Sequence, residues 1–519
     1  MRGIKIWIIF LLCSAISAGS QTLKYVEKEK PEYLDPIYAA RNAVGFRILE
    51  LVFKGLASQD ENGNWVPELA DSIPPLSETM VVPLKAGLMW PDGAGFKNES
   101  LSAEDITFSH QVYMDSSNDY GGRDILESFS VKEGADPSTV RFSLSQIDPR
   151  AIPRMSFRIM PRHVFSDTYI EQGEGYTKFP FGMGPYRVAE NEDTYIKFVA
   201  NAQYHRGAPP IENIELVVAP DDRIHSVLLL SNQVQLDPIL RSGDIQTIDA
   251  NERTGLVPYD SQTWFGFAYN CTNSFLQFRE VRQALTVFFN REDAFTATFG
   301  RGNGELLSGP FTPGSFGVDP RIQPYPHDPG LGEQLLQDAQ LIDRDGDGVR
   351  EDSNGKKMQL RMVLSKSMTQ DNKSVCSDFA QQLKKNQIDV QMDWQEDGAW
   401  YERVFFDRDY DITFVSWKFD EGCNVYPLFS STQQFPGGFN IVEFGNIEVE
   451  KWLNVFRNTT DPTERKEAAQ RLHQRLYEES PYTFLWTLKY NAGIRIDQIK
   501  QIEIHPVNFF GLIHQWEMK

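Results

Sequence analysis

Strand-like and helix-like segments follow one another along all 519 residues, and no repeat period relates them. The stretch KKMQLRMVLS alternates apolar and mostly polar side chains, as a strand does, whereas TERKEAAQRLHQRLYEES is an amphipathic helix opened by Asp461 and Pro462. Strands and helices interleaved in this way predict a mixed α/β fold. A chain of this length exceeds what one hydrophobic core can hold, so we expect at least two lobes.

Six further segments have clear local patterns. Phe46, Leu49, Val52 and Phe53 are spaced for one buried helix face, and Ser102 predicts a helix N-cap. The stretch FGMGPYRVAENEDTYIKFVANAQYH predicts a turn and two strands, with a third strand in IENIELVVAP. We expect one long helix over REVRQALTVFFNREDAFTATF, after a strand in TWFGFAYNC.

The N-terminus has the layout of a secretory signal peptide over residues 1–19. Arg2 and Lys5 precede a short apolar run, and small residues follow it. The run is too short to cross a bilayer, which needs about 20 residues. Cys13 could mark a lipid anchor, but the residues before it are too large for that processing site. We therefore expect a soluble protein exported to the periplasm.

Charge argues against nucleic acid as a partner. The formal net charge is -21, and no basic stripe interrupts it, so the chain repels phosphate backbones. Outside the signal segment three cysteines remain, which allows one disulfide in an oxidising compartment. We favour Cys271 with Cys423, leaving Cys376 as a thiol, although three unpaired cysteines remain an alternative.

The stretch LIDRDGDGVREDSNGKK resembles the start of a calcium loop. Asp343, Asp345 and Asp347 with Gly348 occupy the first ligand offsets of an EF-hand. The closing position is Asn354 instead of a glutamate, and a strand follows where an EF-hand needs a helix. We therefore interpret the loop as a turn with no metal and keep the three aspartates as weak candidates.

No catalytic constellation is present in the sequence. The eight histidines are scattered without zinc spacing, and there is no nucleophile elbow or phosphate loop. We therefore predict a protein that is not an enzyme and has no cofactor.

The order of several motifs resembles the family 5 extracellular solute-binding proteins, the peptide receptors of ABC importers. These motifs, in chain order, are YLDPIYAARN, LVFKGLA with WVPELADS, MWPDGAGFKNESLSAEDITFS, FGMGPYRV, REVRQALTVFFNRE, DRDGDGVREDSNGK and DYDITFVSWKFD. Together they span nearly the whole exported chain. The resemblance implies a periplasmic-binding-protein-like fold with two main lobes, an extra third lobe and a cleft that closes by hinge bending.

The same resemblance implies the extents of the lobes. The first lobe combines residues 20–52, 176–265 and 484–519, the second covers residues 53–175, and the third covers residues 266–483.

The resemblance also implies ligand-binding residues. In peptide-binding members a tryptophan followed three residues later by an aspartate holds the peptide ammonium, and Trp417 and Asp420 match this pattern. Tyr33 would add an apolar wall, as would Trp264 and Trp400 unless these tryptophans fill cores. A carboxylate enclosed between lobes is costly to dehydrate unless a cation meets it. Lys418 could neutralise Asp420 internally, because residues two apart share one face of a strand.

We therefore predict an exported, monomeric receptor that captures short peptides and delivers them to an inner-membrane ABC permease. The alternative is the same architecture with another solute, such as an oligosaccharide or a nickel complex. Ten tryptophans are compatible with sugar stacking. A metal-dependent hydrolase would need a ligand cluster that the sequence lacks. No arginine or lysine can be assigned to a peptide carboxylate from the sequence.

Overall fold

The structure is a computed structural model of the chain. It describes residues 22–519 apart from residues 40–41, 61–64, 92–96, 98, 116–125, 127–128, 145–153, 166–175, 314, 316, 419–423, 460 and 506–507.

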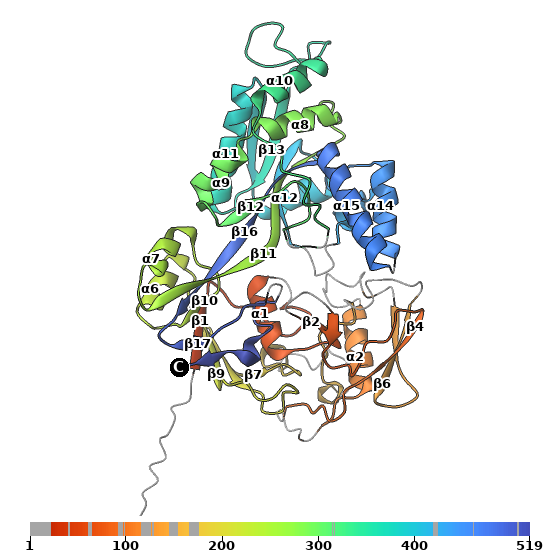
Figure 1. Cartoon of the computed structure of the whole chain (residues 1–519), viewed down its shortest axis with the longest axis vertical. Coiled ribbons are helices and arrows are strands. Elements are labelled where there is room, and N and C mark those ends of the chain that lie inside the picture. The colour runs from red at the N-terminus through yellow and green to blue at the C-terminus, as the bar shows by residue number, and fades with distance from the viewer. Residues whose placement is uncertain are drawn as a thin grey trace, which may run out of the picture.

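The chain folds into two bodies joined by two long strands (Figure 1). We call residues 22–260 with 489–519 the lower body, and residues 264–488 the upper body. Strands β11 (Thr254–Tyr269) and β16 (Tyr482–Arg495) run from one body into the other, side by side and antiparallel. The mixed α/β class expected from the alternating patterns is confirmed.

One sheet extends through both bodies. Within the described residues it has eleven strands, in the order β14-β13-β15-β11-β16-β10-β1-β9-β8-β7, with β12 paired to β16. In the lower body its other strands are β1 (Thr22–Glu27), β7 (Tyr186–Asn191), β8 (Tyr195–Ala200), β9 (Asn213–Val218) and β10 (Leu236–Asp237). In the upper body they are β12 (Gly304–Leu306), β13 (Gln359–Ser365), β14 (Asp389–Gln395) and β15 (Ile412–Lys418).

Smaller sheets complete the lower body. They pair β2 (Ala57–Gln59) with β3 (Trp65–Pro67), β17 (Ile499–Gln501) with β18 (Glu517–Met518), and β4 (Thr79–Pro83) with β6 (Thr139–Leu144), which also pairs with β5 (Phe129–Glu133). The helices of the lower body are α1 (Ala43–Val52), α2 (Ala103–Met114), α6 (His225–Leu230) and α7 (Ile245–Asp249). Those of the upper body are α8 (Arg279–Phe288), α9 (Arg291–Phe299), α10 (Pro329–Asp338), α11 (Gln370–Lys385), α12 (Asp397–Tyr401), α13 (Tyr426–Phe429), α14 (Ile447–Asn458) and α15 (Pro462–Glu479).

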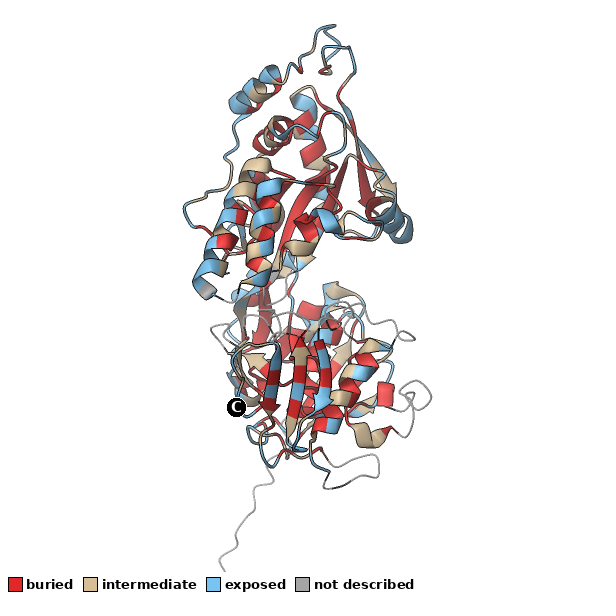
Figure 2. Cartoon of the chain, turned by 90° about the vertical axis from the view of Figure 1, so that its right-hand side faces the viewer, coloured by how far each residue is buried: buried red, intermediate tan, exposed pale blue. Residues whose placement is uncertain are grey.

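The hydrophobic cores follow the two bodies. Buried side chains concentrate in the strands of the sheet and on the inward faces of the helices (Figure 2). The first and second predicted lobes share one core, which contains Leu23 from β1 as well as Val82 and Phe142 from the three-stranded sheet. They therefore pack as a single body.

The change from one body to the other occurs within the crossing strands. Tyr259 packs against the lower core, whereas Trp264 belongs to an upper core. On β16, Trp486 is in an upper core and Ala492 is in the lower one. The β11–β16 register shifts between Asp260 and Trp264, and such an irregularity bends a strand. The predicted lobe boundaries at 265–266 and 483–484 fall inside these two strands.

Local sequence signals explain several elements. Helix α2 begins at a capping box, in which the Ser102 amide donates to Asp105 Oδ2 over 2.9 Å. Helix α15 has Asp461 as N-cap and Pro462 in its first turn, as predicted. The glycine-rich turn before β7 lets the chain approach α1 closely, since a Cβ on Gly184 would lie 2.4 Å from the Val52 carbonyl carbon.

Two expectations for helices are wrong. The predicted long helix is two helices, because α8 ends at Phe288 and α9 starts again at Arg291, with Asn290 as its N-cap accepting from the Asp293 amide. Asparagine favours caps over helix interiors, and this preference outweighs the continuous apolar spacing. In α1, Leu49 and Val52 are buried as expected, but Phe46 is 42% exposed.

A buried ion pair ties α1 to the sheet of the lower body. Arg47 donates from Nε to Glu27 Oε1 over 2.6 Å and from a terminal nitrogen to Oε2 over 2.9 Å. Both side chains are buried, and Arg47 also lies 5.8 Å from the Phe509 ring centroid. Burial raises the pKa of Glu27, and the Arg47 charge opposes this rise.

We expect Glu27→Gln to destabilise the lower body strongly. The change leaves the Arg47 guanidinium buried without a counter-charge, which typically costs about 3–5 kcal/mol. Urea unfolding followed by tryptophan fluorescence measures the loss. The double variant Glu27→Leu/Arg47→Met is the control, because removing both charges restores most of the stability. Equal stability of Glu27→Gln and the parent would show that the pair does not hold the helix.

Candidate ligand-binding cleft

A cleft of about 870 Å³ lies between the two bodies. From the lower body it is lined by α1, β2, β3, the segment around residue 156 and the loop after residue 504. From the upper body it is lined by α13, the loop around Phe439 and the facing parts of α14 and α15. A cavity of this size between two bodies joined by crossing strands fits a small-molecule or peptide site.

Aromatic side chains cover much of the cleft wall. The described aromatic lining residues are Phe46, Trp65, Tyr113, Phe157, Tyr426, Phe435, Phe439 and Phe456. Phe46 is exposed because it faces this cavity instead of the core. Its helical spacing alone therefore wrongly predicts a buried side chain. Apolar walls with few polar groups provide affinity without demanding one side-chain type.

The floor of the cleft is built from two adjacent backbone segments of the lower body. The amide of Leu56 donates to the Met155 carbonyl over 3.3 Å, and the amide of Ile159 donates to the Lys54 carbonyl over 3.1 Å. Gly55 permits this approach, since a Cβ there would lie 2.4 Å from the Ser156 carbonyl oxygen. Lys54 and Arg158 are thereby placed on neighbouring segments.

Glu68, a buried acid next to this floor, has partners at both of its carboxylate oxygens. Glu68 is 1% exposed, contacts His205 Nε2 over 3.2 Å, forms an ion pair with Arg206, and accepts from Ser58 Oγ over 2.8 Å. Burial alone would raise the pKa of Glu68. The hydrogen bond from His205 and the charges of Lys54 and Arg206 overcome burial and hold that pKa far below its usual range.

Lys54 itself is buried without a close partner. Its side chain is 8% exposed, and among the described residues no hydrogen bond or ion pair reaches its ammonium group. Burial lowers the pKa of Lys54 to about 8; the attraction of Glu68 opposes this shift, and repulsion by Arg158 and Arg206 adds to it. The ammonium group is therefore costly to keep charged in the empty protein.

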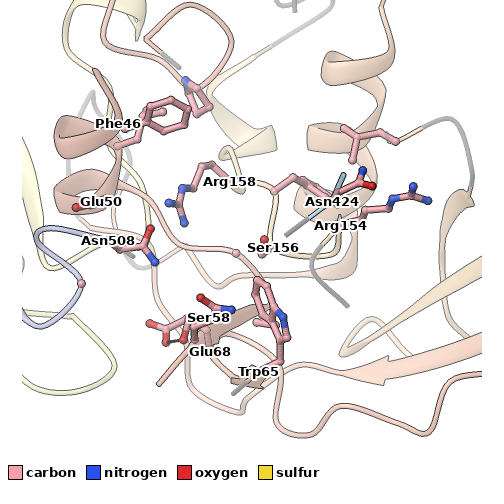
Figure 3. Close-up of a pocket in the computed structure, with 18 of the residues that line it drawn as sticks. Phe46, Glu50, Ser58, Trp65, Glu68, Arg154, Ser156, Arg158, Asn424 and Asn508 are labelled. Carbon is pink, nitrogen blue, oxygen red and sulfur yellow. Dashed lines mark hydrogen bonds between the residues drawn. The ribbon is translucent and has the colours of Figure 1, made fainter. Parts of the chain in front are cut away.

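Figure 3 shows how the labelled side chains lie in the cleft. Arg158 extends toward the side where Glu50 and Asn508 lie, whereas the guanidinium of Arg154 points the opposite way. Glu50 accepts from the Phe510 amide over 2.6 Å, and burial raises the pKa of this carboxyl. Ser58 and Glu68 lie beside Trp65 below them.

The upper body contributes arginines that stack on aromatic rings. The guanidinium carbon of Arg457 lies 4.3 Å from the Tyr426 ring centroid, and that of Arg465 lies 4.9 Å from the Phe456 centroid. The ammonium of Lys418, at the end of β15, lies 5.6 Å from the centroid of Phe46, a contact between the two bodies. Such contacts hold the cations against the aromatic rings.

Asp420, the central residue of the predicted site, lies outside the described residues. The residues on either side of that gap border the cleft: Lys418 lies against Phe46, and Asn424 is a lining residue. The described part of β15 ends at Lys418, so the expectation that Lys418 and Asp420 share one face of a strand stays a prediction.

Three of the four predicted aromatic residues gather around one upper core: Trp264 belongs to it, and Trp400 and Trp417 pack against it, with Trp417 opposite Trp264 in the β11–β15 pairing. None of the four is among the described lining residues of the cleft. Trp417 is half-buried, with ring centroids 5.9 Å from Phe439 and 6.2 Å from Phe405, so it lies behind a cleft wall. Trp400 donates from Nε1 to Thr413 Oγ1 over 3.1 Å. The ring centroid of Tyr33 lies 5.5 Å from that of Tyr38.

Trp264 is the fourth of these residues. It is 0% exposed in an upper core, with its ring 5.3 Å from Tyr482, so this conformation gives no support to its predicted role as a wall. It occupies the core place that large aromatics commonly take.

The acidic loop predicted as a turn connects α10 to β13. Asp343 accepts from the amides of Gly346 and Gly348 over 2.8 and 3.0 Å, and Lys357 donates to Asp345 over 3.0 Å and contacts Asp347. Among the described residues, Asp343, Asp345 and Glu351 bring one carboxylate oxygen each within 4.8 Å of one another. Glu351 is not one of the three aspartates that the sequence pattern indicates.

The favoured disulfide is not formed in this structure. Cys271 and Cys376 are free thiols, and Cys423 lies outside the described residues. Cys271 Sγ donates weakly to the Tyr269 carbonyl over 3.5 Å, and burial raises the pKa of this thiol to about 11. A thiol held protonated in this way reacts slowly.

Ser308 and His473 form a contact that superficially resembles a hydrolase site. Ser308 Oγ lies 3.0 Å from His473 Nε2, but His473 Nδ1 accepts from the Asp319 backbone amide over 2.9 Å. Because Nδ1 is an acceptor, the neutral ring carries its proton on Nε2 and cannot take one from the serine. Burial lowers the pKa of His473 to about 4. The contact is therefore structural.

Comparison with known proteins identifies the family. The bacterial extracellular solute-binding proteins, family 5 Middle, match residues 64–436. The chain belongs to this family. It is a solute-binding protein and not an enzyme, and the periplasmic-binding-protein fold predicted from its motifs is confirmed.

Similar proteins match over nearly the whole length of this binding protein. The oligopeptide-binding protein AppA of Bacillus subtilis is 26% identical over 504 residues, covering 94% of this chain and 90% of AppA. Its structure in complex with a nonapeptide has a TM-score of 0.78 at 22% identity, covering 96% of this chain and 99% of that one. NikZ of Campylobacter jejuni, in complex with Ni(L-His), has a TM-score of 0.79 at 22% identity, covering 96% and 99%.

In the described part of this binding protein, no helix is both long and apolar enough to cross a membrane.

Sequence patterns do not indicate the basic floor of the cleft. Lys54 and Arg158 carry no local motif, and about a hundred residues separate them along the chain. Only the backbone pairing of their two segments brings them together.

Proposed function

We propose that this protein captures short peptides in the cleft between its two bodies and delivers them to an ABC permease in the membrane. The observation that carries the proposal is the cleft of about 870 Å³ between two bodies that the long strands β11 and β16 join. Two bodies joined by a pair of strands can close around a ligand by bending at the joint. Family membership and the oligopeptide-binding relatives support a peptide as the ligand.

The peptide amine would be held by Asp420. The two flanks of its segment, Lys418 and Asn424, both border the cleft, which supports a place for residue 420 at the same cavity. A carboxylate between closing bodies favours the closed state chiefly when a cation arrives to balance it. Trp417 would support this wall from behind Phe439.

Export fits this function. The N-terminal signal segment predicted over residues 1–19 and the membership of an extracellular family support a mature protein in the periplasm. The protein would act there as a monomer, with the permease as its partner.

A thermal-shift screen tests the ligand class. We expect some peptides of two to six residues to raise the melting temperature, because a ligand of the native state stabilises it by about 2.7 kcal/mol at a hundred times its Kd. Oligosaccharides and Ni(L-His) complexes serve as comparison ligands at the same concentrations. A response to either of these without any response to peptides would replace the peptide proposal with that solute.

A further inference from the structure

The connection between α10 and β13 brings three carboxylates together. Asp343, Asp345 and Glu351 each present one carboxylate oxygen, and these oxygens lie within 4.8 Å of one another. None of the three is among the described residues that line the cleft, so the cluster is separate from the site of the proposed ligand. Exposed carboxylates also group by chance on a chain with a net charge of -21, so the environment of each oxygen decides what the cluster can do.

Glu351 is the member of the cluster that a surface turn does not explain. It is 4% exposed, and its Oε1 atom accepts from the Arg344 amide over 2.8 Å. The other oxygen, Oε2, is buried and has no hydrogen-bond partner among the described residues. A buried carboxylate oxygen without a donor costs free energy, because it loses water and gains no bond in exchange. A cation between Glu351 and the two aspartates would supply the missing partner.

The positively charged side chains near the cluster do not supply that partner. Lys357 donates to Asp345 over 3.0 Å, so one of the three carboxylates has a counter-charge. The Arg344 guanidinium donates to the backbone carbonyl of Glu351 over 2.7 Å. In the part of the chain that the structure describes, no ion pair reaches the carboxylate of Asp343 or Glu351. Three converging carboxylates with one ammonium partner repel one another, and a divalent cation between them removes this repulsion.

We infer that Asp343, Asp345 and Glu351 bind a divalent cation of the calcium class. All three ligands are carboxylates, the ligand type that hard cations prefer, whereas zinc and copper favour nitrogen and sulfur. Calcium takes about six to eight oxygens in a flexible geometry, so waters and backbone carbonyls complete the shell around three carboxylates.

Backbone pairing explains how Glu351 reaches the aspartates. Isolated bridges pair Glu351 with Ile342, which directly precedes Asp343, and with Lys357. The closing ligand that the EF-hand pattern lacks at Asn354 is therefore supplied by an earlier residue on the returning chain. A cation held there ties the end of α10 to the start of β13, so it stabilises the upper body without touching the cleft.

Calcium titration of the chelator-treated protein tests the inference. Calorimetry at constant ionic strength should show one site with a Kd at or below about 1 mM, the weak limit of extracellular calcium modules, and calcium should raise the melting temperature. Glu351→Gln keeps the acceptor for the Arg344 amide and should bind calcium at least about 10-fold more weakly, since even residues that only support a metal ligand have effects of this size. Asp338→Asn removes an exposed charge at the end of α10 and should keep the affinity of the parent.

Lys357→Met is a second variant that leaves all three ligands in place. Removing the ammonium that pairs with Asp345 should tighten calcium binding, because the cation no longer competes with it. A parent without one-site binding, equal affinities of Glu351→Gln and the parent, or no tightening in Lys357→Met would each overturn the inference. The proposed peptide function stands in all of these cases, because the cluster does not line the cleft.

Discussion

Replacing Asp420 with asparagine is expected to weaken the binding of a free-amine peptide roughly 30-fold or more, because losing one partner of an enclosed charge pair costs at least about 2 kcal/mol. Asparagine keeps the size of the side chain and removes only its charge. Calorimetric titration of the parent and of Asp420→Asn with one peptide from the screen measures the effect.

Two controls show whether the loss comes from the amine. The N-acetylated form of the peptide lacks the charge, so its affinity should be low for the parent and nearly the same for Asp420→Asn. Glu421→Gln neutralises the neighbouring carboxylate and should keep tight binding. Equal affinity of Asp420→Asn and the parent for the free peptide would remove Asp420 from the site.

Lys54→Met is expected to stabilise the protein in the absence of ligand. At pH 7 the empty variant should gain about 1–3 kcal/mol, because the parent keeps a dehydrated ammonium whose pKa has fallen by more than two pH units. Methionine fills the space with a flexible apolar chain.

The pH dependence of this stability difference has a definite sign. The pKa of Lys54 is about 8 in the folded protein, against 10.5 for the ordinary side chain. Above pH 8 the folded parent releases the proton before the unfolded chain does, so the parent becomes more stable as the pH rises. The advantage of Lys54→Met is therefore full below pH 8 and disappears toward pH 10.5.

The charged groups that act on Lys54 are Glu50, Glu68, Arg158 and Arg206. Chemical unfolding of the parent and of Lys54→Met from pH 7 to 10 measures the difference in the free energy of unfolding. Lys132→Met, at an exposed position on β5, is the control and should show neither the gain nor the pH dependence. A loss of stability in Lys54→Met would mean that Lys54 acts as a structural partner of Glu68.

Local signals in the sequence predicted much of the fold. The Ser102–Asp105 capping box, the strands β7 to β9 and the proline-opened helix α15 depend on interactions within a few residues, and all are present. The helix-to-strand connection around Asp345 followed from alternation in the next segment. These features need no information about distant parts of the chain.

The cleft depends on distant contacts and was poorly predicted. Apolar spacing could not distinguish a core side chain from a wall side chain, so Phe46 was assigned to the wrong environment. For Trp264 the sequence left both a wall role and a core role open, and in the structure it lies in a core. The pairing of the Lys54 and Arg158 segments arises from tertiary structure. Gly55 allows its backbone to approach Ser156, but no sequence motif indicates that these two segments are neighbours.

A crystal structure of the protein with its tightest peptide from the screen tests the central claim most directly. We expect an extended peptide between the two bodies, with its amine about 2.7–3.2 Å from the Asp420 carboxylate. A peptide bound outside this cleft, or a residue 420 carboxylate facing bulk water away from the ligand, would contradict it.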